Sequence, residues 1–144
     1  MGILSDFFVA QEHDAVEYGR LVSTGEPLPA DRFRRHEWKG FTPLELATLW
    51  AIIDRREWSA DDHTLEWVGE ETDGETWLAR FPGLYVERLA TLASPERSRV
   101  VTEWAATEEI AESPETMAPI LDSLVELARD AIHTGRGLFL WGSL

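Results

Sequence analysis

Apolar residues dominate the stretch from Thr42 to about Glu57, which also has the clearest helix start in the sequence. Thr42 suits the N-cap, Pro43 the first helical position, and Glu45 completes a capping box. Leu, Ala, Trp and Ile fill positions 44, 46, 47 and 49–53, so the helix is apolar almost all round for two turns. That pattern is typical of a central, buried helix.

Three further stretches have apolar residues at spacings of three and four, which predicts helices over 82–93, 95–110 and 117–133. Pro119 indicates that the last helix begins near Thr116, because proline is tolerated in the first turn but not later. Gly135 is a natural C-cap. We expect these helices to pack around a core that includes Trp50, Trp104, Leu121 and Leu124.

Strand-like segments lie at both ends of the chain and in its middle. Ile3 to Val9 reads as a strand and Gly137 to Leu144 as a short apolar one, with a short helix expected from Gln11 to Gly19. Segments 65–68 and 76–80 flank Asp73–Gly74, a turn signal that predicts a β-hairpin. We expect the terminal strands to pair with each other or with the hairpin. The prediction is an α+β fold, dominated by helices, in a single domain over 1–144.

Charge narrows the choice of partners. The chain has 27 Asp and Glu against 13 Lys and Arg, a net charge of -14. Such a surface repels nucleic-acid phosphate and anionic lipid, so we expect no direct nucleic-acid binding, no membrane association, and a partner with a basic surface. The absence of cysteine excludes disulfides and thiolate metal sites. Twelve of the 13 basic residues are Arg, which suggests a bacterial source, and the lack of a signal peptide suggests the cytoplasm.

Four of the seven tryptophans directly follow a glutamate, at the pairs that end in Trp38, Trp58, Trp67 and Trp104. Neighbouring side chains point in different directions in helices and in strands, so the carboxylate can stay in water while the indole is buried. Trp104 lies in an apolar helix face and is expected in the core. Trp38 and Trp58 lie at polar boundaries, where core filling competes with an exposed binding role.

A basic island interrupts the acidic chain. The segment from Arg32 to Lys39 holds four basic residues with aromatic residues between them, and its candidate binding residues are Arg32, Arg34, Arg35, His36, Trp38 and Lys39. Guanidinium groups among aromatic rings suit carboxylate, phosphate or peptide recognition. The alternative is that these cations neutralise the protein's own acids.

Catalytic and metal-binding signatures are weak. Three of the four histidines have a carboxylate at helical reach: His13 with Glu17, His63 with Glu66, and His133 with Asp130. Such spacings are expected by chance in a chain with 27 acids and indicate surface ion pairs, and neither His-Glu-x-x-His nor Gly-x-Ser-x-Gly occurs. We assign no catalytic residue, and we expect no metal and no cofactor.

The leading hypothesis is a non-enzymatic protein-binding module, such as an immunity protein, an antitoxin-like inhibitor or an adaptor. The alternatives are a small-molecule or metal-dependent enzyme that uses the Arg32–Lys39 region, and an acidic mimic of DNA. The sequence leaves the oligomeric state open.

Overall fold

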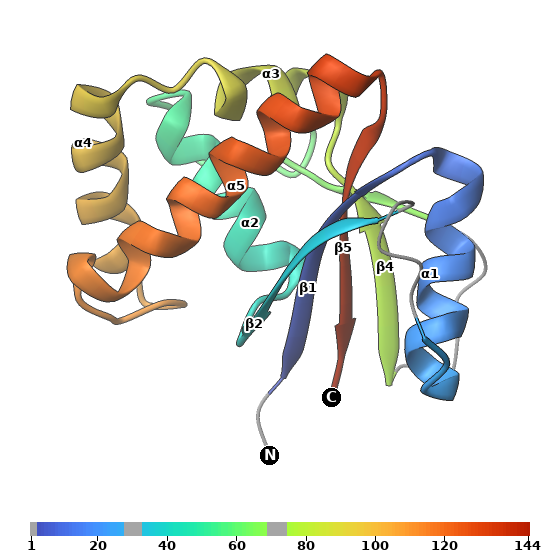
Figure 1. Ribbon diagram of the computed structural model, residues 1–144. Coiled ribbons are helices and arrows are strands. Elements are labelled where there is room, and N and C mark those ends of the chain that lie inside the picture. Colours follow the sequence, from blue (N-terminus) through green and yellow to red (C-terminus); the bar gives the residue numbers. More distant parts are fainter. Residues whose placement is uncertain (1–2, 28–32, 69–74) are drawn as a thin grey trace.

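The computed structural model describes residues 3–27, 33–68 and 75–144. Over these residues the chain forms a five-stranded antiparallel sheet with helices on both faces (Figure 1). This arrangement confirms the predicted α+β fold. The elements in chain order are β1 (Leu4–Ala10), α1 (Glu12–Thr24), β2 (Arg34–Lys39), α2 (Pro43–Ile53), β3 (Glu66–Trp67), β4 (Thr76–Arg80), α3 (Gly83–Ala90), α4 (Ser94–Ala105), α5 (Pro114–Thr134) and β5 (Gly137–Ser143).

The strand order is β2-β1-β5-β4-β3. The predicted terminal strands are therefore neighbours, with Phe7 opposite Leu140, and β5 also pairs with β4 of the predicted hairpin. The hairpin strands pair through Glu66 with Arg80 and Trp67 with Ala79. Its expected turn at Asp73–Gly74 lies outside the described residues.

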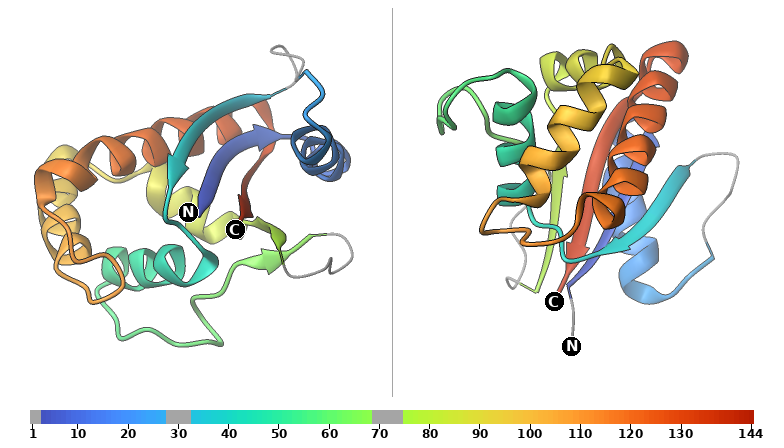
Figure 2. Two further views of the ribbon diagram at one scale, coloured as in Figure 1. Left: turned by 90° about the horizontal axis from the view of Figure 1, so that it is seen from below. Right: turned by 90° about the vertical axis from the view of Figure 1, so that its left-hand side faces the viewer.

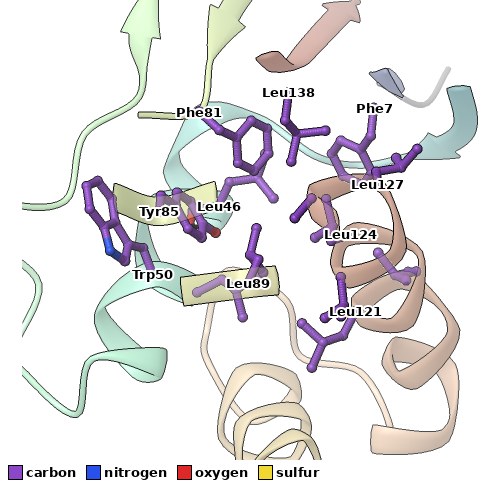
Figure 3. Packing of buried hydrophobic residues seen from close by; sticks show 14 of the residues in the cluster. Phe7, Leu46, Trp50, Phe81, Tyr85, Leu89, Leu121, Leu124, Leu127 and Leu138 are labelled. Atoms are coloured by element: carbon purple, nitrogen blue, oxygen red, sulfur yellow. Dashed lines mark hydrogen bonds between the residues drawn. The ribbon is translucent and has the colours of Figure 1, made fainter. Parts of the chain in front are cut away.

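The two faces of the sheet are covered unequally. Helices α2 to α5 enclose the larger core, which receives Phe7 from β1 and Leu138 from β5 (Figure 3). Helix α1 covers the other face, where Phe8 stacks on Tyr18 with ring centroids 3.8 Å apart. Figure 2 shows α1 on one side of the sheet and the other helices opposite it. Adjacent residues of one strand thus serve two cores, as the alternation of strand side chains requires.

Helix α2 begins as predicted. The Thr42 side chain accepts the Leu44 N–H, and the Glu45 carboxylate accepts the Thr42 N–H at 2.9 Å. Trp50, predicted to be buried, stacks on Tyr85, and Trp104 is fully buried. Both tryptophan predictions are confirmed.

Several helix ends differ from the prediction because local signals compete with tertiary packing. Helix α1 continues through Gly19 and ends at Gly25, which has the left-handed conformation. Helix α5 begins at Pro114, after the N-cap Ser113, so Pro119 lies inside it. Its missing N–H removes one hydrogen bond of the second turn, while the turns on either side bury residues such as Met117 and Leu121.

The other three helices are shorter than predicted. The ranges 43–57, 82–93 and 95–110 shrink to 43–53, 83–90 and 94–105. After α2 the chain turns at Arg55, which has a positive φ of 56°, and after α4 it turns at Ala111, with a φ of 49°. No glycine or proline marks these two turns in the sequence. No helix among the described residues is long and apolar enough to cross a membrane.

Candidate protein-binding surface

The basic island forms an edge strand, β2, which was not predicted as a strand. Arg34, His36 and Trp38 lie on the side of the sheet covered by α2 to α5, whereas Arg35 and Lys39 lie on the side of α1. The expected site residues therefore do not share one surface. Arg32 lies outside the described residues.

Two of these arginines are paired with the protein's own acids. Arg34 contacts the carboxylate of Glu126 and lies 3.4 Å from that of Asp130, both on α5. Arg35 Nη2 lies 2.5 Å from Glu37 Oε1, and its Nη1 lies 3.5 Å from Asp6 Oδ2. This arrangement matches the interpretation that the island balances local negative charge.

Asp6 and Tyr18 form a buried polar contact beneath Arg35. The Tyr18 hydroxyl donates to Asp6 Oδ2 at 2.6 Å, and Arg35 Nη1 donates to the same hydroxyl oxygen at 3.3 Å. Burial raises the pKa of the Asp6 carboxyl, although the Tyr18 hydrogen bond and the Arg35 charge oppose that shift. Burial and the bond to Asp6 also raise the pKa of Tyr18. The contact ties α1 to the sheet through two buried side chains.

A cleft of about 750 Å³ lies along the outer face of α5. Its charged lining carries both signs: Arg34, Arg97 and Arg129 face Asp122, Glu126 and Asp130, and His133 also lines the cleft. Arg97 Nε donates to the Leu92 carbonyl at 3.0 Å and Arg129 Nε to the Ala90 carbonyl at 2.9 Å. These two arginines hold the C-terminal end of α3, so the cleft is a mixed-charge surface and lacks the convergent free cations of a phosphate pocket.

Two tryptophans are exposed near the edge of the sheet opposite β2. Both lie in the segment from Asp54 to Val68, which we call the tryptophan flank. Trp58 is 49% exposed and Trp67 is 68% exposed. Trp67 belongs to β3, the edge strand farthest from β2. Both residues follow a glutamate. Tryptophan is enriched at the buried centre of protein interfaces.

A buried histidine anchors the tryptophan flank. His63 is fully buried and its ring packs edge-on against Trp50 of α2, with centroids 5.4 Å apart. Its Nδ1 accepts the Ser59 N–H at 3.2 Å, which requires that the ring proton of the neutral imidazole lie on Nε2. Nε2 faces Asp54 Oδ2 at 3.4 Å, an electrostatic contact without hydrogen-bond geometry. The loop that carries Trp58 is thereby fixed to the core.

Acidic residues flank the exposed indoles in the sequence. In the tryptophan flank, Arg55 pairs with Glu96 of α4 at 2.8 Å and Arg56 with Asp62 at 2.7 Å. Glu57 and Asp61 have no ion-pair partner among the described residues. The flank therefore combines exposed aromatic area with carboxylates that can receive a cation from outside.

Sequence reasoning found only part of this surface. Trp58 is a candidate for exposure in the sequence, whereas Trp67 is not. The exposure of Trp67 depends on the position of its strand at the edge of the sheet, which the sequence does not give. His63 was interpreted as one member of a surface ion pair, but it is buried and its partner is Asp54 instead of Glu66. Among the described residues, no group of three or more aspartate, glutamate or histidine side chains is placed so that it could hold a metal ion.

The comparisons with known proteins add no assignment. No protein-family model, curated protein or solved structure matches this chain.

Proposed function

We propose that this chain is a protein-binding module whose tryptophan flank receives a basic surface of its partner. The observation that carries the proposal is the presence in one segment of two exposed indoles, Trp58 and Trp67, and of carboxylates that have no ion-pair partner among the described residues. Immunity proteins, antitoxin-like inhibitors and adaptors are the functional classes that it covers.

Energetics favour the indoles as the centre of the contact. Tryptophan, tyrosine and arginine supply most binding hot spots, and truncation of a hot-spot side chain costs about 2 kcal/mol or more. An arginine or lysine of the partner gains additional cation–π attraction over the face of an indole. The loop around His63 holds Trp58 before binding, so less conformational entropy is lost when the partner docks.

Charge favours a basic partner. At a net charge of -14 the chain attracts a cationic surface and accelerates its approach. Glu57 and Asp61 beside Trp58 provide local acceptors for that surface. An acidic mimic of DNA is one form of such a module, since its partner would also use a basic site.

The enzyme alternative has less support. It requires the Arg32–Lys39 region to gather around a substrate, but Arg34 and Arg35 extend to opposite faces of the sheet. In addition, Arg34 is held between Glu126 and Asp130.

The test is affinity capture from lysate of the source cells with three immobilised proteins. These are the natural chain, the double variant Trp58→Ala/Trp67→Ala, and the control Val16→Ala/Ile132→Ala. Val16 and Ile132 are 52% and 51% exposed and lie on α1 and α5, away from the tryptophan flank. The control therefore truncates half-exposed apolar side chains elsewhere on the surface.

We expect a basic protein that is retained by the natural chain and by the control but lost from the tryptophan variant. Its purified form should bind the tryptophan variant about 30-fold or more weakly in calorimetry, the equivalent of about 2 kcal/mol. Displacement of the partner by duplex DNA would identify the chain as a DNA mimic. Equal retention by all three proteins would refute the assignment of the flank.

A further inference from the structure

The outer edge of β2 is open for pairing. Gly40 donates its N–H to the Ile3 carbonyl at 2.8 Å, which fixes the hydrogen-bonding phase between β1 and β2. The even-numbered residues of β2 therefore face β1, and the N–H and C=O groups of Arg35, Glu37 and Lys39 point outward. Within residues 3–27, 33–68 and 75–144, no group bonds to these outward backbone groups.

The side chains along this edge leave it accessible on the α1 side. Helix α1 packs over β1 and β5, where it meets Phe8, Phe139 and Trp141. Arg35 contacts the Tyr18 hydroxyl of α1, but Arg35, Glu37 and Lys39 all remain exposed. Figure 2 shows β2 at the margin of the sheet. The strand has six residues, contains no proline and forms no bulge in its register with β1.

The charges of β2 are complementary to themselves in one antiparallel register. When two copies pair with His36 opposite His36 of the second copy, Arg35 of each chain lies opposite Glu37 of the other. Outward-facing residues then form the hydrogen-bonded pairs, as the backbone geometry requires. Opposite charges directly across two strands are favourable, and like charges are unfavourable. The next register that keeps outward-facing residues opposite each other moves every partner by two residues. It places Glu37 opposite Glu37 and Arg35 opposite Lys39, so charge disfavours it.

We propose that two copies of this chain associate through β2 in the register centred on His36, which joins their sheets into one continuous antiparallel sheet. The inference is independent of the proposed function, because β2 and the tryptophan flank lie at opposite edges of the sheet. A two-fold axis through the paired His36 residues makes the contact closed, so the assembly stops at a dimer.

Cysteine cross-linking tests the register directly, since the natural chain has no cysteine. Directly opposite residues of an antiparallel pair have Cα atoms about 4.5–5.5 Å apart, within the range of a disulfide. In the proposed register, His36→Cys should form a disulfide-linked dimer rapidly under mild oxidation. Lys39→Cys is the control, because its two copies would lie six residues apart along the paired strands. Glu37→Cys reports the shifted register.

The second readout is sedimentation velocity over a wide range of protein concentration. The experiment is done near 0.15 M salt, because the Debye length is then about 8 Å and long-range repulsion between the two acidic chains is screened. We expect a monomer–dimer equilibrium that Glu37→Gln weakens about threefold and Glu37→Arg at least tenfold, because each removes or inverts the pairing with Arg35. In the shifted register, Glu37→Gln would instead strengthen the dimer. A monomer at every concentration, or cross-linking of Lys39→Cys as fast as His36→Cys, would overturn the proposal.

Discussion

Replacement of His63 by alanine should weaken both the fold and the display of Trp58. His63 contributes three effects that the structure separates: burial of its ring, edge-on packing against Trp50, and acceptance of the Ser59 N–H. The hydrogen bond is worth about 0.5–1.5 kcal/mol and the aromatic pair about 0.5–1.5 kcal/mol beyond its area. With the cavity that remains, we expect a total loss of about 2–4 kcal/mol in the free energy of unfolding.

Urea denaturation followed by far-UV circular dichroism measures this loss. For a chain of this length each kcal/mol corresponds to about 2–4 °C, so the melting temperature should fall by about 5–15 °C. Amide hydrogen exchange should accelerate most between Arg55 and Thr64, since that loop loses its anchor. His13→Ala is the control, because His13 is exposed on α1 and its loss should cost under about 0.5 kcal/mol.

A second variant separates the hydrogen bond from the ring. In His63→Asn the side-chain oxygen lies close to the position of Nδ1 and can still accept the Ser59 N–H. Its stability should lie between those of the natural chain and His63→Ala. The reasoning fails if the alanine variant unfolds within about 0.5 kcal/mol of the natural chain. If the asparagine variant is no more stable than the alanine variant, the hydrogen bond to the Ser59 N–H does not contribute to stability.

Three further predictions concern packing and buried polar contacts. Gly142→Ala should cost about 1–3 kcal/mol in urea denaturation, because an added Cβ would lie 2.2 Å from the Trp77 indole; unchanged stability would contradict this packing. Tyr18→Phe should cost about 1.5–3 kcal/mol, because it removes a charge-assisted hydrogen bond to Asp6. Tyr85→Phe removes a neutral hydrogen bond to the Leu46 carbonyl and should cost about 0.5–1.5 kcal/mol. Equal losses in the two variants would refute the distinction. Because the pKa of the Asp6 carboxyl is raised, the folded state holds the Asp6 proton more tightly than the unfolded state does. Asp6 therefore favours folding most at low pH, and this contribution is lost as the pH rises through the pKa of Asp6 in the folded state. The stability of the natural chain relative to Asp6→Asn should therefore decline from about pH 4 upward, and a rising difference would show that the Tyr18 bond and the Arg35 charge outweigh burial.

The elements that the sequence predicts well are those whose signals are local. The start of α2 depends on Thr42, Pro43 and Glu45, which are adjacent in sequence, and the structure has the same capping box. The ends of helices depend on more distant partners. Helix α2 stops at Ile53 because the chain turns at Arg55 to bring His63 against Trp50, a contact that no local pattern announces.

Strand β2 was missed for a different reason. Its sequence, Arg-Arg-His-Glu-Trp-Lys, lacks alternation of apolar and polar residues because an edge strand buries little of either face. The cluster of basic residues in the sequence suggests a binding site. Once the strand is paired with β1, however, the side chains of this cluster lie on two opposite faces of the sheet. A cluster in sequence became two separate sets of contacts, with Arg34 on α5 and Arg35 on Asp6.

The Glu-Trp pairs show that the place of each pair in the fold, and not the dipeptide itself, decides whether its indole is buried. Trp104 lies on a helix face that meets other helices and is fully buried. Trp67 has the same preceding residue, yet it lies on the two-residue edge strand β3 and keeps 68% of its surface exposed. Burying that indole at a partner's surface would be favourable at about 25 cal/mol per Å² of apolar area removed from water. Both glutamate side chains remain largely exposed, so the same pair fills the core in α4 and leaves its indole exposed in β3.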